Sequence, residues 1–122
     1  MKTSLTKLVG DLKSIDGVEA IYLFGSVTRG KAKPISDIDI CVITNEDGNK
    51  KRDEILSTAS DKIDTSVFWD LPLIIQYRVI KDGKPIFVRN SMFLHKIATS
   101  TVNRYLDFKP VIDRRTMRMM AG

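Results

Sequence analysis

The chain has 122 residues, of which 43% are hydrophobic and 29% charged, and it carries a formal net charge of +5. These values exclude a disordered chain, and no apolar run approaches the ~20 residues that span a bilayer. Cys41 is the only cysteine, which excludes a disulfide framework. The stretch MKTSLTKLVGDLKSI lacks the apolar centre of a secretion signal, so we expect one cytoplasmic domain over residues 1–122.

The first half of the chain is predicted to alternate between helices and strands. Leucines recur at helical spacing before Gly17, and β-branched and aromatic residues fill the runs that follow. Helices are predicted over residues 3–16 and 51–60, and strands over residues 18–24, 38–43 and 63–68.

The second half is predicted to be mainly helical. Pro72 suits the first turn of a helix that ends at Gly83, with an apolar stripe of Leu73, Ile74, Tyr77 and Ile80. A short strand over residues 84–89 precedes Ser91, the predicted N-cap of a helix through about residue 106. Pro110 is expected to break or restart that helix within a C-terminal helical tail over about residues 91–122. Strands alternating with helices favour an α/β sandwich.

Two aspartates one residue apart begin the second predicted strand. Side chains two apart on a strand face the same way, so Asp37 and Asp39 project together with Cα atoms ~6.5 Å apart, while Ile38 and Ile40 face the core. Carboxylates this close repel each other unless a cation lies between them. Oxygen ligands without a His or Cys cluster favour Mg²⁺ or Mn²⁺. The alternative is that one aspartate caps a turn and the other faces solvent.

A glycine–serine pair and several cations come before these aspartates. Gly25 lets backbone N–H groups approach a phosphate, and the Ser26 hydroxyl donates to one of its oxygens. Arg29, Lys31 and Lys33 supply positive charge close by. A phosphate loop beside a carboxylate pair indicates a site for a metal–nucleoside triphosphate. The alternative is a helix N-cap followed by a solvated basic loop.

The same stretch, GSVTRGKA, nearly fits the P-loop pattern G-x-x-x-x-G-K-[ST], which would indicate phosphoryl transfer. Ala32 has no hydroxyl to bind Mg²⁺, and Pro34 would interrupt the helix that must begin there. The P-loop interpretation is therefore disfavoured.

The spacing Gly25-Ser26, ten residues, then Asp37-Ile38-Asp39 resembles the G-S-x(10)-D-x-D signature of the minimal nucleotidyltransferases of the DNA polymerase beta superfamily. This resemblance implies a small mixed β-sheet with flanking helices, the polymerase beta palm-like fold. In that family a third carboxylate on a neighbouring strand completes the metal site. The matching position in KIDTSVF is Asp64.

The resemblance also implies transfer of AMP from ATP to a hydroxyl group, with pyrophosphate leaving. Asp37 and Asp39 would bridge two Mg²⁺ ions, with Mn²⁺ as an alternative metal, and Asp64 would ligate the second ion. Gly25 and Ser26 would hold the terminal phosphates, with Arg29 or Lys31 offsetting charge on the pyrophosphate.

Small members of this family act as antitoxins of toxin–antitoxin pairs, so the resemblance implies a HEPN-type partner modified on a tyrosine. Methionines and aromatics suit such a partner surface, or else complete the core or a homo-oligomer; they are Met92, Phe93, Tyr105, Phe108, Met117, Met119 and Met120. Membrane and nucleic-acid partners are not expected. The second hypothesis is a catalytically silent binding module that neutralises its partner by occlusion.

Overall fold

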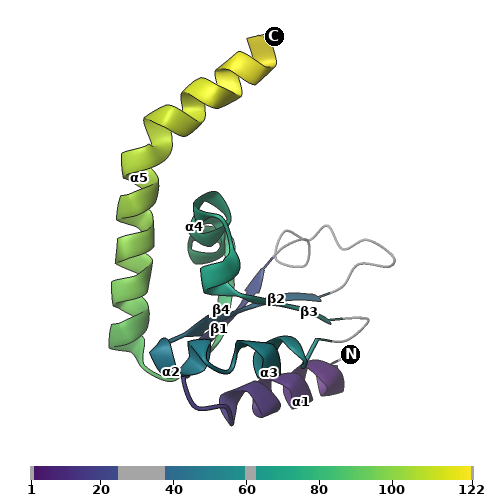
Figure 1. Cartoon of the computed structure of the whole chain (residues 1–122). Helices are drawn as coiled ribbons and strands as arrows, with labels where there is room; N and C mark the ends of the chain where they lie inside the picture. Colours follow the sequence, from purple (N-terminus) through teal and green to yellow (C-terminus); the bar gives the residue numbers. More distant parts are fainter. Residues whose placement is uncertain (1, 25–37, 60–62, 122) are drawn as a thin grey trace.

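The protein forms a mixed four-stranded sheet covered by helices on both faces (Figure 1). The computed structural model describes the backbone of residues 2–24, 38–59 and 63–121, and the side chains of residues 5–24, 38–59 and 63–108. In chain order the elements are α1 (Lys2–Lys13), β1 (Val18–Phe24), β2 (Ile38–Thr44), α2 (Glu46–Asn49), α3 (Arg52–Leu56), β3 (Ile63–Val67), the 3₁₀ turn η1 (Phe68–Asp70), α4 (Leu73–Asp82), β4 (Lys84–Val88) and α5 (Ser91–Ala121). The α/β prediction is therefore confirmed.

The sheet has the strand order β3-β2-β1-β4. Strand β1 lies antiparallel to both β2 and β4, whereas β2 and β3 are parallel. A parallel pair needs a crossover rather than a hairpin, and here α2 and α3 carry the chain between β2 and β3. The two strands consequently start at the same end of the sheet.

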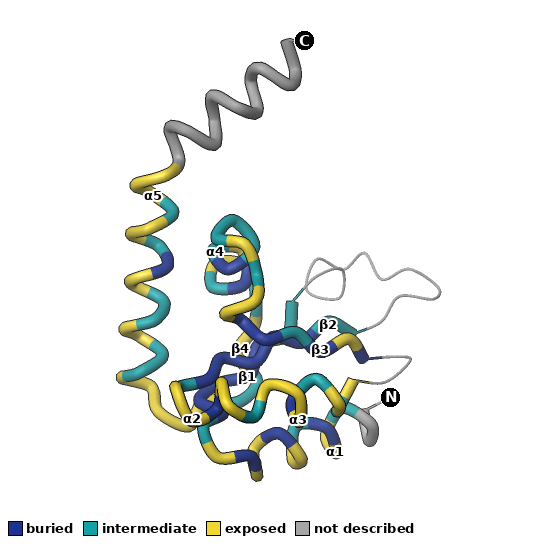
Figure 2. Tube along the Cα trace, in the orientation of Figure 1, coloured by how far each residue is buried: buried dark blue, intermediate teal, exposed yellow. Residues whose placement is uncertain are grey.

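The sheet separates two apolar cores. On one face, α1 and α3 cover Ile21, Ile40 and Val42, all fully buried. On the other face, α4 and the first part of α5 cover Ile43 and Phe68, also fully buried. Figure 2 shows the buried strands between these two helical layers. Alternate residues of β2 serve opposite cores, as the period-two pattern of a strand requires.

Two glycines join the start of β1 to α2. Gly17 has a φ of +94°, and a Cβ atom on it would lie 2.1 Å from the Gly48 backbone nitrogen. The Gly17 carbonyl accepts a hydrogen bond from the Asn45 backbone N–H at 2.9 Å. Both the left-handed backbone and the close approach require glycine at position 17.

Helices α4 and α5 pack against each other as well as against the sheet. The rings of Tyr77 and Tyr105 stack with centroids 3.8 Å apart and planes 7° from parallel. Gln76 and Val79 form the buried side of α4, so the predicted stripe on this helix was partly wrong. Gln76 is buried because its side-chain amide donates to the Phe68 carbonyl at 3.0 Å, which satisfies a polar group that the pattern placed outside.

Helix α5 also differs from its prediction at both ends. Asn90 rather than Ser91 caps it, because the Asn90 side-chain oxygen accepts from the Phe93 backbone N–H at 3.1 Å. The helix continues through Pro110 to Ala121 as one element. A proline inside a helix removes one backbone hydrogen bond, and a helix of 31 residues retains the others. No helix in the described ranges is long and apolar enough to cross a membrane.

Candidate active site

The predicted site residues fall partly within the described structure. Asp39 lies on β2 and Asp64 on β3. The remaining predicted residues lie outside the described ranges; they are Gly25, Ser26, Arg29, Lys31 and Asp37. The structure therefore describes two of the three predicted carboxylates.

Asp39 and Asp64 are direct register partners on the parallel strands β2 and β3. Neighbouring strands lie about 4.8 Å apart, and paired residues point to the same face of the sheet. That face is the one shared with Cys41 and Ile43, because Ile38 and Ile40 turn toward the opposite core. The fold thus brings together two acids that are 25 positions apart in the chain.

Asp39 and Asp64 form a row of side chains across two strands, the carboxylate row, and Phe24 extends this row onto a third strand. It is the register partner of Asp39 across the antiparallel β1–β2 pair and is partly buried on the same face. Phe24 is the last residue of β1, and Ile38 is the first of β2. In the sequence, the glycine–serine pair follows Phe24 directly and Asp37 precedes Ile38. Both described flanks of the phosphate-loop segment therefore lie beside the two carboxylates.

The chemistry of this donor set suits a hard divalent cation. Asp64 is exposed and Asp39 is half-buried, so a hydrated ion could reach both. Within the described ranges no group of three or more His, Cys, Asp and Glu side chains could hold a metal ion. The described residues thus supply two oxygen donors of the predicted three, and these fit Mg²⁺ or Mn²⁺.

The side chains two positions further along β1 and β2, on the same face of the sheet, are buried and rigid. Tyr22 and Cys41 are register partners, 6% and 0% exposed. Burial raises the pKa of the Cys41 thiol, and burial followed by the neighbouring thiol raises the pKa of the Tyr22 hydroxyl. These side chains stay neutral at physiological pH and provide a packed base beside the carboxylates.

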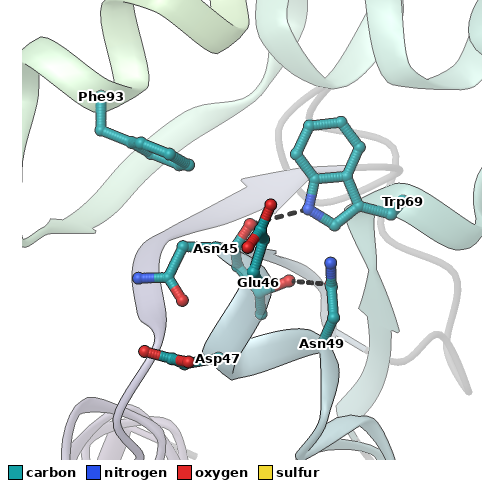
Figure 3. A pocket seen from close by; sticks show the side chains of 7 residues that line it. Asn45, Glu46, Asp47, Asn49, Trp69 and Phe93 are labelled. Atoms are coloured by element: carbon teal, nitrogen blue, oxygen red, sulfur yellow. Dashed lines mark hydrogen bonds between the residues drawn. The ribbon is translucent and has the colours of Figure 1, made fainter.

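A second hollow, which the sequence did not predict, lies at the opposite end of β2 (Figure 3). It has a volume of about 470 Å³ and is lined by Thr44, Asn45, Glu46, Asp47, Asn49, Trp69 and Phe93. The five residue steps from Asp39 to Thr44 span about 17 Å of strand, so this pocket is separate from the carboxylate row. Its residues come from β2, α2, η1 and α5, and no local motif could have grouped them.

A sheet of this topology with two acids in register defines a nucleotidyltransferase-like domain, and the comparison with protein families agrees. The model of the family "Polymerase beta, Nucleotidyltransferase" matches residues 6–92, which is more than half of the chain. The protein belongs to this family. The match ends within the first turn of α5.

A candidate protein adenylyltransferase from Methanocaldococcus jannaschii is 40% identical to this chain over 70 residues. The matched part is 57% of this chain and 56% of that relative. The chain therefore matches just over half of the relative's length.

Solved structures share the fold over nearly the whole chain. A chain of a toxin–antitoxin complex with AMP-PNP matches with a TM-score of 0.65 and 22% identity, over 94% of this chain and 98% of its own length. A chain from the complex of the tri-AMPylated Shewanella oneidensis HEPN toxin with its MNT antitoxin matches with a TM-score of 0.59 and 21% identity, over 94% and 95%. These likenesses establish the palm-like fold, which confirms the predicted fold class.

Proposed function

We propose that this protein transfers AMP from ATP to a tyrosine hydroxyl of a HEPN-type partner protein, as an antitoxin. Family membership supports nucleotidyl transfer, and the Methanocaldococcus jannaschii relative supports a protein acceptor. The solved complexes that share the fold support ATP as donor and a HEPN protein as partner. The observation that carries the proposal is the register pairing of Asp39 with Asp64.

In this proposal Asp37, Asp39 and Asp64 hold two Mg²⁺ ions, with Mn²⁺ as an alternative. Bound ions would neutralise the triphosphate and lower the pKa of the acceptor hydroxyl. The chain's own task is to hold the carboxylates of Asp39 and Asp64 side by side on one face of the sheet. The buried row of Tyr22 and Cys41 supports this, since packing behind the acids fixes the strands that carry them.

Gly25 and Ser26 would bind the terminal phosphates, and Arg29 or Lys31 would offset the charge of the leaving group. The acceptor oxygen forms a bond to the α-phosphorus, and the bond from that phosphorus to the bridging oxygen breaks. Pyrophosphate leaves with the bonding electrons. Asp64, the exposed acid of the pair, accepts the proton of the hydroxyl.

The partner surface is proposed to include α5, the tail of a single domain over residues 1–122. In the part of α5 whose side chains the structure describes, three large apolar residues are exposed: Met92 is 66% exposed, Leu106 54% and Phe108 55%. Figure 2 shows exposed positions recurring along this helix. The family match ends at residue 92, where α5 begins, so most of α5 lies outside the matched nucleotidyltransferase region.

These exposed residues also favour the second candidate function, a binding module that neutralises its partner by occlusion alone. The two candidates differ in what they require of the carboxylates. Occlusion needs α5 and not the acids, whereas transfer needs both.

The deciding experiment compares ATP labelled at the α-phosphate with ATP labelled at the γ-phosphate, in the presence of Mg²⁺ and host lysate. Label from the α position alone, on a band whose mass identifies the acceptor, would establish AMP transfer. Label from the γ position would instead support phosphoryl transfer.

The matched variants are Asp39→Asn and Asp82→Asn, the latter removing an exposed acid at the end of α4. Transfer should be lost with the first and kept with the second. If the wild type binds its partner without labelling it, occlusion is the function.

A further inference from the structure

We propose that the pocket between Trp69 and Phe93 is a second binding site, and that it takes a guanidinium group such as an arginine side chain. This site is independent of the carboxylate row and of nucleotide transfer. The proposal stands on three features of the pocket: its charge, its aromatic walls and the way those walls are held.

The charge of the pocket is opposite to that of the chain. The whole chain has 20 lysines and arginines against 15 acidic residues. Among the residues that the structure describes, the pocket lining includes Glu46 and Asp47 and no lysine or arginine. A hollow with this lining attracts a cation and repels a phosphate.

A further carboxylate lies one hydrogen bond beyond the pocket wall. Glu19 on β1 is 8% exposed, and its Oε1 accepts from the side-chain nitrogen of Asn45, a lining residue, at 2.7 Å. The other oxygen of Glu19 is buried and has no hydrogen-bond partner within the described part of the chain. A buried carboxylate oxygen that is left unpaired adds negative potential on this side of the pocket.

Two aromatic rings form the opposite boundary. Trp69 is 36% exposed although it is a large apolar residue, and Phe93 reaches in from the first turn of α5. In Figure 3 the Glu46 carboxylate points toward the space between the two rings. A planar cation stacks well on an indole face, and a guanidinium can at the same time donate to a carboxylate.

The Trp69 side of the pocket is held in place before any ligand arrives. The Trp69 indole N–H donates to the Thr44 carbonyl at 2.7 Å, and its ring meets Phe68 edge-on with centroids 5.1 Å apart. The Thr44 hydroxyl donates to the Asn49 side-chain oxygen at 2.6 Å, and Asn45 accepts from the Gly48 backbone N–H at 3.1 Å. A site whose side chains are already held loses little entropy on binding.

The test uses Trp69 as its own reporter, since it is the only tryptophan. The full chain is titrated with N-acetyl-arginine amide and with the citrulline counterpart, which has the same shape without the charge. Saturable change of the tryptophan fluorescence is expected with arginine only, and added salt should weaken it. A peptide with a central arginine, against its citrulline version, separates a protein source of the guanidinium from a free small molecule.

The variants are Glu46→Gln, which removes the charge nearest the rings, and Glu54→Gln, which removes an exposed acid of α3 outside the pocket. Glu46→Gln should weaken arginine binding by about tenfold or more, as the loss of a hydrogen bond between charged groups predicts, while Glu54→Gln should leave it unchanged. An equal response to citrulline or to neutral adenosine would overturn the proposal. So would arginine binding that Glu46→Gln leaves intact.

Discussion

Asp39 and Asp64 face the same side of the sheet as direct register partners on parallel strands. Each is therefore expected to be essential for transfer and dispensable for folding. Asp39→Asn and Asp64→Asn should each lower the rate of AMP transfer at least about 100-fold, because the amide keeps the shape and removes the charge. Initial rates with α-labelled ATP measure this. A rate within a few-fold of the wild type would remove that residue from the site.

Addition of metal should stabilise the wild type and not the two variants. A ligand that binds only the folded state raises the free energy of unfolding by about 2.7 kcal/mol at 100 times its dissociation constant. We expect the melting temperature to rise with Mg²⁺ or Mn²⁺ and to return to its metal-free value when EDTA is added. The exposed-acid variant Asp82→Asn should respond like the wild type. If the metal raised the melting temperature of Asp64→Asn as much as that of the wild type, the ion would bind elsewhere.

The sequence identified both acids but could not establish that they are neighbours. Asp39 stood out because it belongs to a DxD pair, and Asp64 because it matches the position of the third carboxylate in the family that the motif resembles. Their contact depends on the parallel pairing of β2 and β3, which follows from the crossover through α2 and α3. Local periodicity specifies which face a residue takes within a strand, and it does not specify which strands meet.

One prediction failed where a polar group found its partner outside its own helix. Gln76 occupies the buried side of α4 because the Phe68 carbonyl accepts from it, so the apolar stripe alone identified the packed side of this helix only in part. Such contacts satisfy buried polar groups without leaving a local pattern. The pocket at Trp69 was missed for a different reason, because its walls come from four separate elements.

Gly17 and Gly10 should respond in opposite ways to alanine. At Gly17 the φ of +94° and the approach of the Gly48 backbone both oppose a side chain, so Gly17→Ala should destabilise the protein by about 2 kcal/mol or more. At Gly10, in α1, a Cβ atom would meet nothing within 4 Å. Gly10→Ala should stabilise the helix by about 0.4–1 kcal/mol. Urea unfolding measures both, and a neutral Gly17→Ala would contradict the packing of α2 on β1.

Because Cys41 is buried, we expect the protein to lose stability at alkaline pH. The pKa of Cys41 is raised above the ordinary value of 9.0, so the folded protein keeps the proton after the unfolded chain has lost it. The unfolded state then binds fewer protons, and stability present below pH 9.0 falls as pH rises, by about 1.4 kcal/mol per unit for one thiol.

Cys41→Ala is the matched variant for this effect. It should be less stable at neutral pH because of the cavity, yet lose stability less steeply above pH ~9. Tyr22, whose pKa is also raised by burial, remains in the variant and accounts for the residual slope at higher pH. Urea unfolding at a series of pH values tests this. Parallel curves for the two proteins would show that the thiol does not titrate as its burial requires.

Helix α5 has a part that packs on the fold and a part that is available to a partner. Tyr105 represents the first part and Phe108 the second. Tyr105 stacks on Tyr77 of α4, whereas Phe108 is 55% exposed. Tyr105→Ala should lower the free energy of unfolding by about 1–3 kcal/mol, combining lost burial with a lost aromatic pair. Phe108→Ala should change it by less than about 0.5 kcal/mol but weaken binding of the partner. Unfolding and partner binding are measured on both variants. If Phe108→Ala binds the partner as the wild type does, this stretch of α5 is not the partner surface, and the exposed Met92 at its other end becomes the position to test.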